Sequence, residues 1–193
     1  FCENGKPAPH VLALDERTPA HVEAWVLVEL LHRGIDRDRF SKALPYPAKD
    51  LMLGDHEEHE AEAFHEELNA LNGWVLNAVT ALVELRHEIA RESGVDASKI
   101  PIVCWPQTFQ LGIETSISPA SDGDTLRIGL SAGDALRPQP YFFVGTSEQA
   151  LKGDFDPGSV LSVQRIASEN LAADDVIAFL RAQVGSHRKR IAS

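Results

Sequence analysis

The chain has 193 residues, of which 44% are hydrophobic and 24% are charged, the composition of an ordinary globular domain. Its 18 basic and 29 acidic residues give a formal net charge of −11. A negatively charged protein repels phosphate backbones and anionic lipid, so nucleic acid is excluded as a partner class. We predict one domain over residues 1–193, with a helical part at about 19–94 and a sheet with a closing helix at about 100–185.

Membrane and disulfide signals are weak. The longest apolar run, residues 24–31, contains Glu29 and is too short to span a bilayer. The first residues lack the features of a signal peptide, and Cys2 and Cys104 give no disulfide framework. We therefore predict no membrane partner and a cytoplasmic location. Cys104 is predicted to be a small buried side chain, because no basic residue flanks it to activate a thiol.

The first predicted helix runs from about Pro19 to Arg33. Thr18 supplies an N-cap oxygen, Pro19 suits the first helical position, and Gly34 can take the left-handed conformation that ends a helix. A stripe of apolar side chains on one face is predicted to be buried. The stripe consists of Ala24, Leu27, Val28 and Leu31.

A second, longer helical pattern runs from about Glu57 to Glu92. Its apolar residues step by four and three, which places them on one side of a helix or of a helix pair. These residues are Phe64, Leu68, Leu71, Val75, Ala78, Leu82, Leu85 and Ile89. The dipeptide Asn72-Gly73 is the weak point, because glycine costs about 1 kcal/mol against alanine inside a helix. A kink or a break is compatible with this position.

The stretch 100–144 is predicted to form a central sheet. Apolar and polar residues alternate over 109–114 and over 126–130, the period of two expected for strands with one buried and one wet face. Turn residues at 118–124 separate them, which predicts an antiparallel hairpin. Residues 140–144 and 160–166 are further candidate strands.

A closing helix is predicted from about Ala173 to Val184. Asp174 and Asp175 suit its positive N-terminal end, Gly185 follows its last turn, and residues 186–190 form a basic tail. The predicted fold class is α+β, with N-terminal helices packed on a mainly antiparallel sheet and a C-terminal helix that closes the core.

Three motifs carry a resemblance. They are Trp-Pro-Gln-Thr-Phe at 105–109, Gly-Leu-Ser-Ala-Gly-Asp at 129–134 and Pro-Tyr-Phe-Phe-Val at 140–144. Their order resembles an uncharacterised family of bacterial proteins known as a domain of unknown function, most clearly from Pro101 to about Val184. In that family the first motif often reads Trp-Pro-His-His-Phe-Asp, whereas this chain has Gln107, Thr108 and Gln110 at the polar positions. The resemblance therefore implies a fold and leaves the function open.

The motif Gly-x-Ser-x-Gly at 129–133 matches the nucleophile elbow of serine hydrolases. Asp154 or Asp156 and then His187 follow in the hydrolase order. An elbow must lead into a helix and a parallel crossover, yet only a few residues separate Gly133 from the next strand. A structural turn, in which Ser131 and Asp134 bond local amides, is the favoured interpretation.

Pairs of glutamate and histidine three residues apart are candidate metal ligands. Two residues at this spacing share a helix face, as in dinuclear carboxylate sites of helical bundles. The pairs are Glu29 with His32, Glu62 with His65, and Glu84 with His87, and an acidic run with His56 and His59 precedes the second pair. The favoured interpretation of these pairs is a solvent-exposed polar helix face, on which residues three apart interact without a metal. A divalent metal is the only cofactor that these residues indicate, and its ligands would be His56, His59, Glu62, His65, Glu84 and His87.

The leading functional hypothesis is a binding module for a small molecule or a partner, without established catalysis. Aromatic side chains beside amides on a sheet suit an amphipathic ligand. The candidate binding residues are Trp105, Gln107, Phe109, Gln110, Ser131, Asp134, Tyr141 and Phe143. The alternative is a metal-dependent hydrolase or oxidoreductase that uses the Glu-x-x-His pairs, and the third is a serine hydrolase at Ser131. The sequence leaves open whether the chain is an enzyme and whether it forms homo-oligomers.

Overall fold

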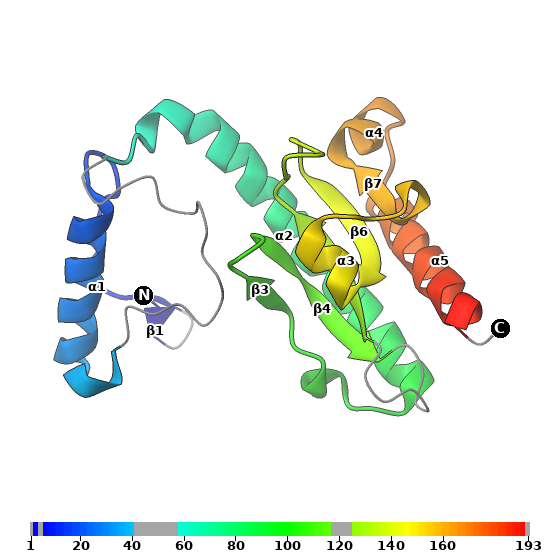
Figure 1. The fold of residues 1–193 in the computed structure, drawn as a ribbon, viewed down its shortest axis with the longest axis horizontal. Helices are drawn as coiled ribbons and strands as arrows, with labels where there is room; N and C mark the ends of the chain where they lie inside the picture. Colours follow the sequence, from blue (N-terminus) through cyan, green and yellow to red (C-terminus); the bar gives the residue numbers. More distant parts are fainter. Residues whose placement is uncertain (1, 4–5, 41–57, 117–124, 192–193) are drawn as a thin grey trace. The chain divides into compact units, whose positions relative to one another are not determined.

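The computed structural model describes residues 2–3, 6–40, 58–116 and 125–191. It divides into two compact units, residues 1–68 and residues 69–193. Helices combine with an antiparallel sheet and a C-terminal helix, so the α+β prediction is confirmed (Figure 1). In these described ranges no helix has both the length and the apolar character needed to cross a bilayer.

Among the described residues of the first unit, the long helix is α1, over Pro19–His32. The predicted start is confirmed, because Thr18 Oγ1 accepts a hydrogen bond from the His21 amide at 3.3 Å and Pro19 occupies the first turn. The other elements of this unit are short: β1 (Cys2–Glu3), β2 (Lys6–Pro7), η1 (Arg37–Arg39) and η2 (Glu62–Phe64). Strands β1 and β2 pair antiparallel.

The predicted buried stripe of α1 is wrong. Ala24, Val28 and Leu31 are exposed and Leu27 is only partly buried. The buried residue of this helix is instead Glu29, which is 4% exposed. Its carboxylate accepts hydrogen bonds from Arg33 and from His10, the latter at 3.0 Å. The hydrogen bond from Arg33 and, to a smaller extent, the one from His10 hold the pKa of Glu29 below its usual value. The buried side chain is therefore an ionised carboxylate with paired partners.

Helix α2 runs from His65 to Ser93 and passes through Asn72 and Gly73 without a break. The predicted apolar stripe is confirmed in its second half, where Ala78, Leu82, Leu85 and Ile89 are buried. It is wrong at its start, because Phe64 and Leu68 are 56% and 50% exposed. The short helix η2, which directly precedes α2, is bonded to a segment far earlier in the chain, since the Glu62 amide donates to Asp15 Oδ1 at 2.9 Å.

Gly73 lies inside α2, and a Cβ atom built on it would meet nothing within 4 Å. We therefore expect Gly73→Ala to raise the free energy of unfolding by about 1 kcal/mol, because alanine loses less backbone entropy in a helix. Urea unfolding followed by circular dichroism measures the change. Gly94→Ala is the matched control at the end of the helix. Its φ of +66° is left-handed, so alanine there should lower the stability by about 1 kcal/mol. A gain at both positions would contradict the argument.

The second unit is built on a five-stranded antiparallel sheet in the order β3-β4-β5-β6-β7. The strands are β3 (Val103–Trp105), β4 (Gln110–Ser116), β5 (Thr125–Ser131), β6 (Tyr141–Thr146) and β7 (Val160–Ser162). Each strand pairs with its neighbour in the chain. The predicted hairpin of β4 with β5 is confirmed by their antiparallel pairing, although its connection, residues 117–124, lies outside the described residues.

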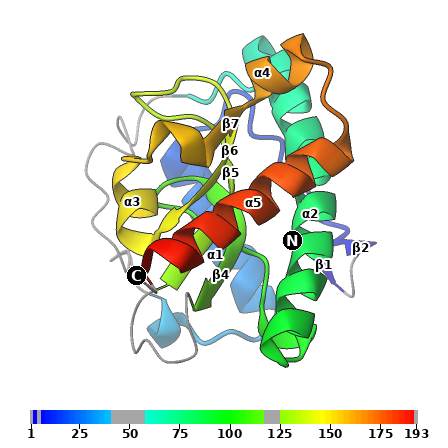
Figure 2. The same ribbon diagram turned by 90° about the vertical axis from the view of Figure 1, so that its right-hand side faces the viewer.

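Helices cover both faces of this sheet (Figure 2). On the face that we call the helical face, apolar strand residues pack with α2 and with α5 (Ala173–Ile191). These strand residues are Ile113, Leu126, Ile128, Leu130, Phe142, Val144 and Leu161. On the opposite face, called the α3 face, Tyr141 and Phe143 pack against Ala150 of α3 (Ser147–Lys152) and against Phe155. The remaining short helices are η3 (Ala97–Lys99), η4 (Pro157–Ser159) and α4 (Val163–Ser168).

Several details differ from the sequence predictions. The face predicted to be exposed to solvent is buried at Gln110, Gly112 and Gly129, because α3 and the segments around it cover this end of the sheet. The candidate strand at 160–166 ends at Ser162, whose hydroxyl caps α4. Helix α5 continues through Gly185, so the predicted basic tail is helical. Cys104 is exposed and not buried, since it lies on the short edge strand β3.

Candidate functional site

The strand register brings four of the predicted binding residues into one row on the α3 face. Trp105 pairs with Gln110, Gln110 with Ser131, and Ser131 with Tyr141. Directly paired residues of antiparallel strands point to the same face, so these side chains are neighbours across four strands. Phe143 belongs to the next row, opposite Gly129. The structure thus places five of the eight predicted binding residues on one face.

A pair of glycines makes room for a long side chain on this face. Gly112 and Gly129 are directly opposite one another. Their row lies between the row that contains Gln110 and the row that contains Arg127. The Arg127 guanidinium carbon nevertheless lies 4.4 Å from the centroid of the Trp105 ring, which belongs to the row beyond the glycines. The arginine side chain therefore runs along the sheet over the two glycines and meets the aromatic ring as a cation–π pair.

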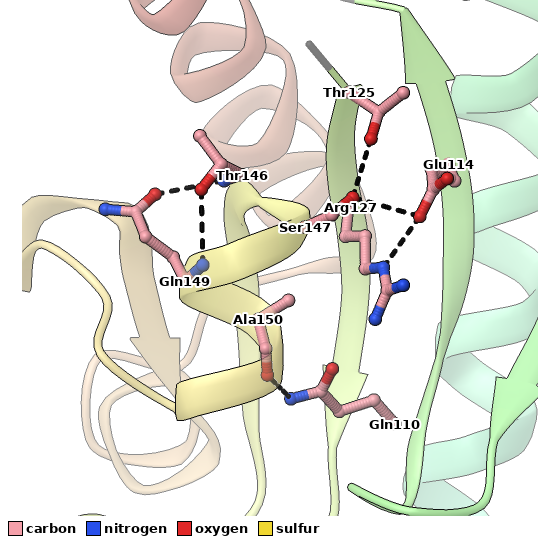
Figure 3. A network of polar contacts seen from close by, with 8 residues as sticks. All are labelled: Gln110, Glu114, Thr125, Arg127, Thr146, Ser147, Gln149 and Ala150. Carbon is pink, nitrogen blue, oxygen red and sulfur yellow. Dashed lines mark hydrogen bonds and ion pairs between the residues drawn. The ribbon is translucent and has the colours of Figure 1, made fainter. Parts of the chain in front are cut away.

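Arg127 is held in this position by a network that joins β4, β5 and α3 (Figure 3). Its Nε donates to Glu114 Oε2 at 2.7 Å. The same oxygen accepts from the Ser147 hydroxyl at 3.0 Å, and Ser147 Oγ lies 2.6 Å from Thr125 Oγ1. The Arg127 side chain is 15% exposed and that of Glu114 39%. A charged donor and acceptor in this setting fix one orientation of the guanidinium.

Two buried polar atoms of this face have no hydrogen-bond partner within the described part of the chain. They are Gln110 Oε1 and Arg127 Nη1. The other end of the Gln110 amide is anchored, because Nε2 donates to the Ala150 carbonyl at 2.9 Å. Figure 3 shows the Gln110 oxygen on the side of the amide that faces Arg127. Thr108 Oγ1, in the adjoining turn, is a third buried atom of this kind. Such atoms cost about 1–3 kcal/mol each unless a partner satisfies them.

The position of α3 over this site follows from local sequence signals. Thr146 and Gln149 form a reciprocal capping box, with bonds of 3.2 Å and 3.0 Å, and Gly153 ends the helix at φ +69°. Gly145 precedes the helix, and a Cβ atom there would lie 2.8 Å from the Phe155 ring. The absence of a side chain at Gly145 therefore lets Phe155 pack closely on the sheet beside α3.

Ser131, Asp134 and Tyr141 form a structural group at the end of β5. Asp134 Oδ1 accepts from the amides of Leu136 and Arg137, both at 2.8 Å, and its Oδ2 accepts from the Tyr141 hydroxyl. Ser131 Oγ accepts from the Gly133 amide at 3.2 Å. The predicted structural turn, with local bonds to Ser131 and Asp134, agrees with these contacts.

Burial, followed by the hydrogen bond to Asp134, raises the pKa of Tyr141 to about 12. An unfolded tyrosine ionises at about pH 10, so the stability from this group is full below pH 10 and is lost as the pH rises toward 12. We expect an ultraviolet absorbance titration to show a late phenolate transition that Tyr141→Phe removes. The only other tyrosine, Tyr46, lies outside the described residues. Ionisation of both tyrosines near pH 10 in protein that circular dichroism shows to be folded would contradict this.

The turn between β3 and β4 contains the remaining predicted binding residues, Gln107 and Phe109. Gln107 is partly buried, whereas Phe109 is 61% exposed. Phe109 has a φ of +48°, a left-handed conformation that is uncommon for a bulky residue. The Thr108 amide donates to the Trp105 carbonyl at 3.2 Å and closes the turn. An exposed aromatic residue thus directly precedes Gln110, the first residue of β4.

The residues of the serine-hydrolase hypothesis lie apart. Ser131 is on the α3 face, whereas His187 belongs to α5 on the helical face. His187 Nε2 instead lies 3.2 Å from Ser159 Oγ, and both side chains are buried. Burial, and then the nearby Arg190 guanidinium, lower the pKa of His187. Asp156 bonds Arg190 at 3.0 Å. This group connects α5 to η4.

The predicted metal ligands do not form a cluster in the described ranges, where no three side chains of histidine, cysteine, aspartate or glutamate are placed to hold an ion. His59, Glu62, His65, Glu84 and His87 are all exposed. His56 lies outside the described residues. The unbroken course of α2 through Asn72 and Gly73 also removes the fold-back that would bring its two halves together. Metal binding stays a prediction.

A shallow hollow of about 350 Å³ lies on the surface between α2 and α5. Its lining consists of Glu88, Arg91, Glu92 and Arg181. The charges are largely paired, since Arg181 donates to both Glu88 oxygens and Arg188 donates to Glu92 at 2.8 Å. Small-molecule sites combine apolar walls with a few polar groups, and this hollow has only charged walls. We therefore interpret this hollow as a gap between surface ion pairs and not as a small-molecule site.

Comparison of the chain with protein-family models, with curated proteins and with solved structures finds no match. The resemblance to the uncharacterised bacterial family stays a prediction. The α3 face around Gln110 and Arg127 is the candidate site on its own geometry.

Sequence reasoning found Trp105 and Gln110 but missed Arg127, Glu114 and Ser147. One signal was present. Arg127 and Glu114 are opposite charges on neighbouring predicted strands, and such cross-strand pairs mark a shared face. The contribution of Ser147 had no comparable signal, because α3 has only six residues and was not predicted.

Proposed function

We propose that the chain binds a small polar molecule on the α3 face of its sheet, at the end formed by the turn between β3 and β4. The observation that carries the proposal is the pair of buried atoms Gln110 Oε1 and Arg127 Nη1 on one face, without partners among the residues described. Native proteins satisfy nearly all such groups, so an acceptor and a donor left open together favour a ligand that bonds both.

The surroundings support a binding role in preference to catalysis. The donor and the acceptor are each fixed by a second bond, to Glu114 and to Ala150. Trp105 supplies an aromatic wall, and the exposed Phe109 has a conformation that costs free energy and is typical of functional turns. The face lacks the close pairing of a nucleophile with a base that covalent catalysis requires, as far as the described residues show.

Arg127→Lys tests the proposal with little change in charge. Lysine keeps a cation for Glu114 but removes the planar fork that presents Nη1. Arg165→Lys is the matched control, because Arg165 makes an exposed ion pair with Glu169 at 2.9 Å on α4, away from the site. Saturation-transfer NMR with a panel of small neutral, anionic and cationic molecules measures binding to each protein.

We expect at least one class of molecule to bind the native chain and the Arg165→Lys control, and to lose most of its binding to Arg127→Lys. Circular dichroism and the thermal midpoint check that the variants are folded. Binding that is equal in all three proteins would place the ligand elsewhere. The absence of binding by every member of the panel would overturn the proposal.

A further inference from the structure

The two buried atoms without partners, Gln110 Oε1 and Arg127 Nη1, have fixed and opposite hydrogen-bonding roles. Because Gln110 Nε2 donates to the Ala150 carbonyl at 2.9 Å, the amide has one allowed orientation and Oε1 is an acceptor. Arg127 Nη1 can only donate. A molecule that satisfies both must therefore offer an N–H or O–H group to Gln110 and an oxygen or nitrogen acceptor to Arg127.

The charge of the site favours a neutral group. Glu114 already balances Arg127 through the 2.7 Å bond to Nε, and Ser147 also donates to this carboxylate. An anion would lose its hydration without meeting an uncompensated cation, and it would approach Glu114. A cation would face the guanidinium. A neutral ligand group avoids both costs.

The aromatic ring favours a planar group. The Trp105 ring covers the guanidinium at 4.4 Å, so a ligand that reaches Nη1 in the guanidinium plane has the ring beside it. A planar group can lie against an aromatic face and keep its donors and acceptors in the plane. A carboxamide combines a planar shape, zero charge, an N–H donor and a carbonyl acceptor.

We propose that the ligand group recognised by this face is a carboxamide that carries an N–H, whose carbonyl accepts from Arg127 and whose N–H donates to Gln110. This inference rests on the proposed function, and it names the chemical class that the site takes. The class includes side-chain amides, peptide bonds and the amide edges of heterocycles, which share the same donor and acceptor.

Four small probes separate the classes on the full chain. Acetamide has both groups, N,N-dimethylacetamide lacks the N–H, acetate is an anion with acceptors only, and ethylene glycol offers hydroxyls without a planar amide. The side-chain NMR signals of the Trp105 indole, the Gln110 amide and Arg127 Nε report binding at the site. We expect acetamide to cause saturable shifts and the other three probes to bind at least about tenfold more weakly, as for the loss of one hydrogen bond.

Two variants complete the test. Gln110→Met removes the acceptor and should weaken acetamide about tenfold, whereas Gln164→Met, at an exposed position of α4, should leave binding unchanged. Arg127→Lys is the second site variant if Gln110→Met does not fold. Acetate or glycol binding as tightly as acetamide, in an Arg127-dependent way, would overturn the amide class and leave the proposed function standing. Acetamide binding that is unchanged by Gln110→Met would also overturn it. Failure of every probe to bind in an Arg127-dependent way would remove both proposals.

Discussion

Gly129→Ala is expected to lower the free energy of unfolding by about 3 kcal/mol or more. A Cβ atom built on Gly129 would lie 2.1 Å from the Leu111 carbonyl oxygen and 2.9 Å from the Gly112 Cα. Both are backbone atoms of the neighbouring strand, so no side chain can rotate away and the strands must separate. Because Arg127 crosses these glycines to reach Trp105, the same change should also displace the guanidinium.

Denaturant unfolding measures the loss, and the cation–π contact is followed through the Trp105 indole NMR signal. Gly158→Ala is the matched control in η4, where a Cβ atom would meet nothing within 4 Å. It should change the stability by less than about 0.5 kcal/mol, as most surface substitutions do. An unchanged unfolding midpoint for Gly129→Ala would show that β4 and β5 have more room than their backbone positions allow.

Leu180→Ala is the second large effect that we expect, at about 2–5 kcal/mol of lost stability. Leu180 is fully buried in α5 and packs with α2 and the helical face of the sheet. The substitution removes apolar contacts and leaves a cavity that a helix packed on a sheet cannot readily close.

The neighbouring residue gives a sharp control. Arg181 makes a bidentate ion pair with Glu88, but the Arg181 side chain is 52% exposed. Solvent screens such pairs, so Arg181→Ala should cost less than about 1 kcal/mol despite its short hydrogen bonds. Thermal and urea unfolding of the two variants compare core packing with a surface ion pair on one helix. A larger loss for Arg181→Ala than for Leu180→Ala would reverse this ranking.

The central strands were predictable because their signals are local. Leu126, Ile128 and Leu130 alternate with polar or small residues, and the alternation matches the pleat of β5. Turn residues divide the stretch into short segments that pair with their chain neighbours. Local periodicity was therefore enough to predict β4, β5 and their antiparallel hairpin, and the aromatic and β-branched residues at 140–144 predicted the strand β6.

The buried face of α1 was not predictable in the same way. Residues 24–28 are all apolar, so no periodicity selects one face of the helix. The buried carboxylate of Glu29 is paired with Arg33, one helical turn later, and also with His10, which lies 19 residues earlier in the chain. A long-range partner of this kind leaves no mark in a window of one or two helical turns.

The candidate site was predictable only in part. The aromatic Trp105 and the amide Gln110 were recognised by residue type, but their neighbour Arg127 reaches them by crossing two glycines that face each other. That crossing requires the register of β4 with β5, which alternation alone does not give. The cover over Gln110 depends on α3, whose six residues are too few for a helical period to appear.

The position of α5 has a consequence for synthesis of the chain. All five strands precede α5, and each strand pairs with the next one along, so the sheet needs only short loops to close. Until residues 173–191 leave the ribosome, part of the helical face, including Phe142 and Val144, has no α5 to cover it. A nascent or truncated chain that stops before this helix would carry an apolar sheet surface in water and would therefore be prone to aggregate.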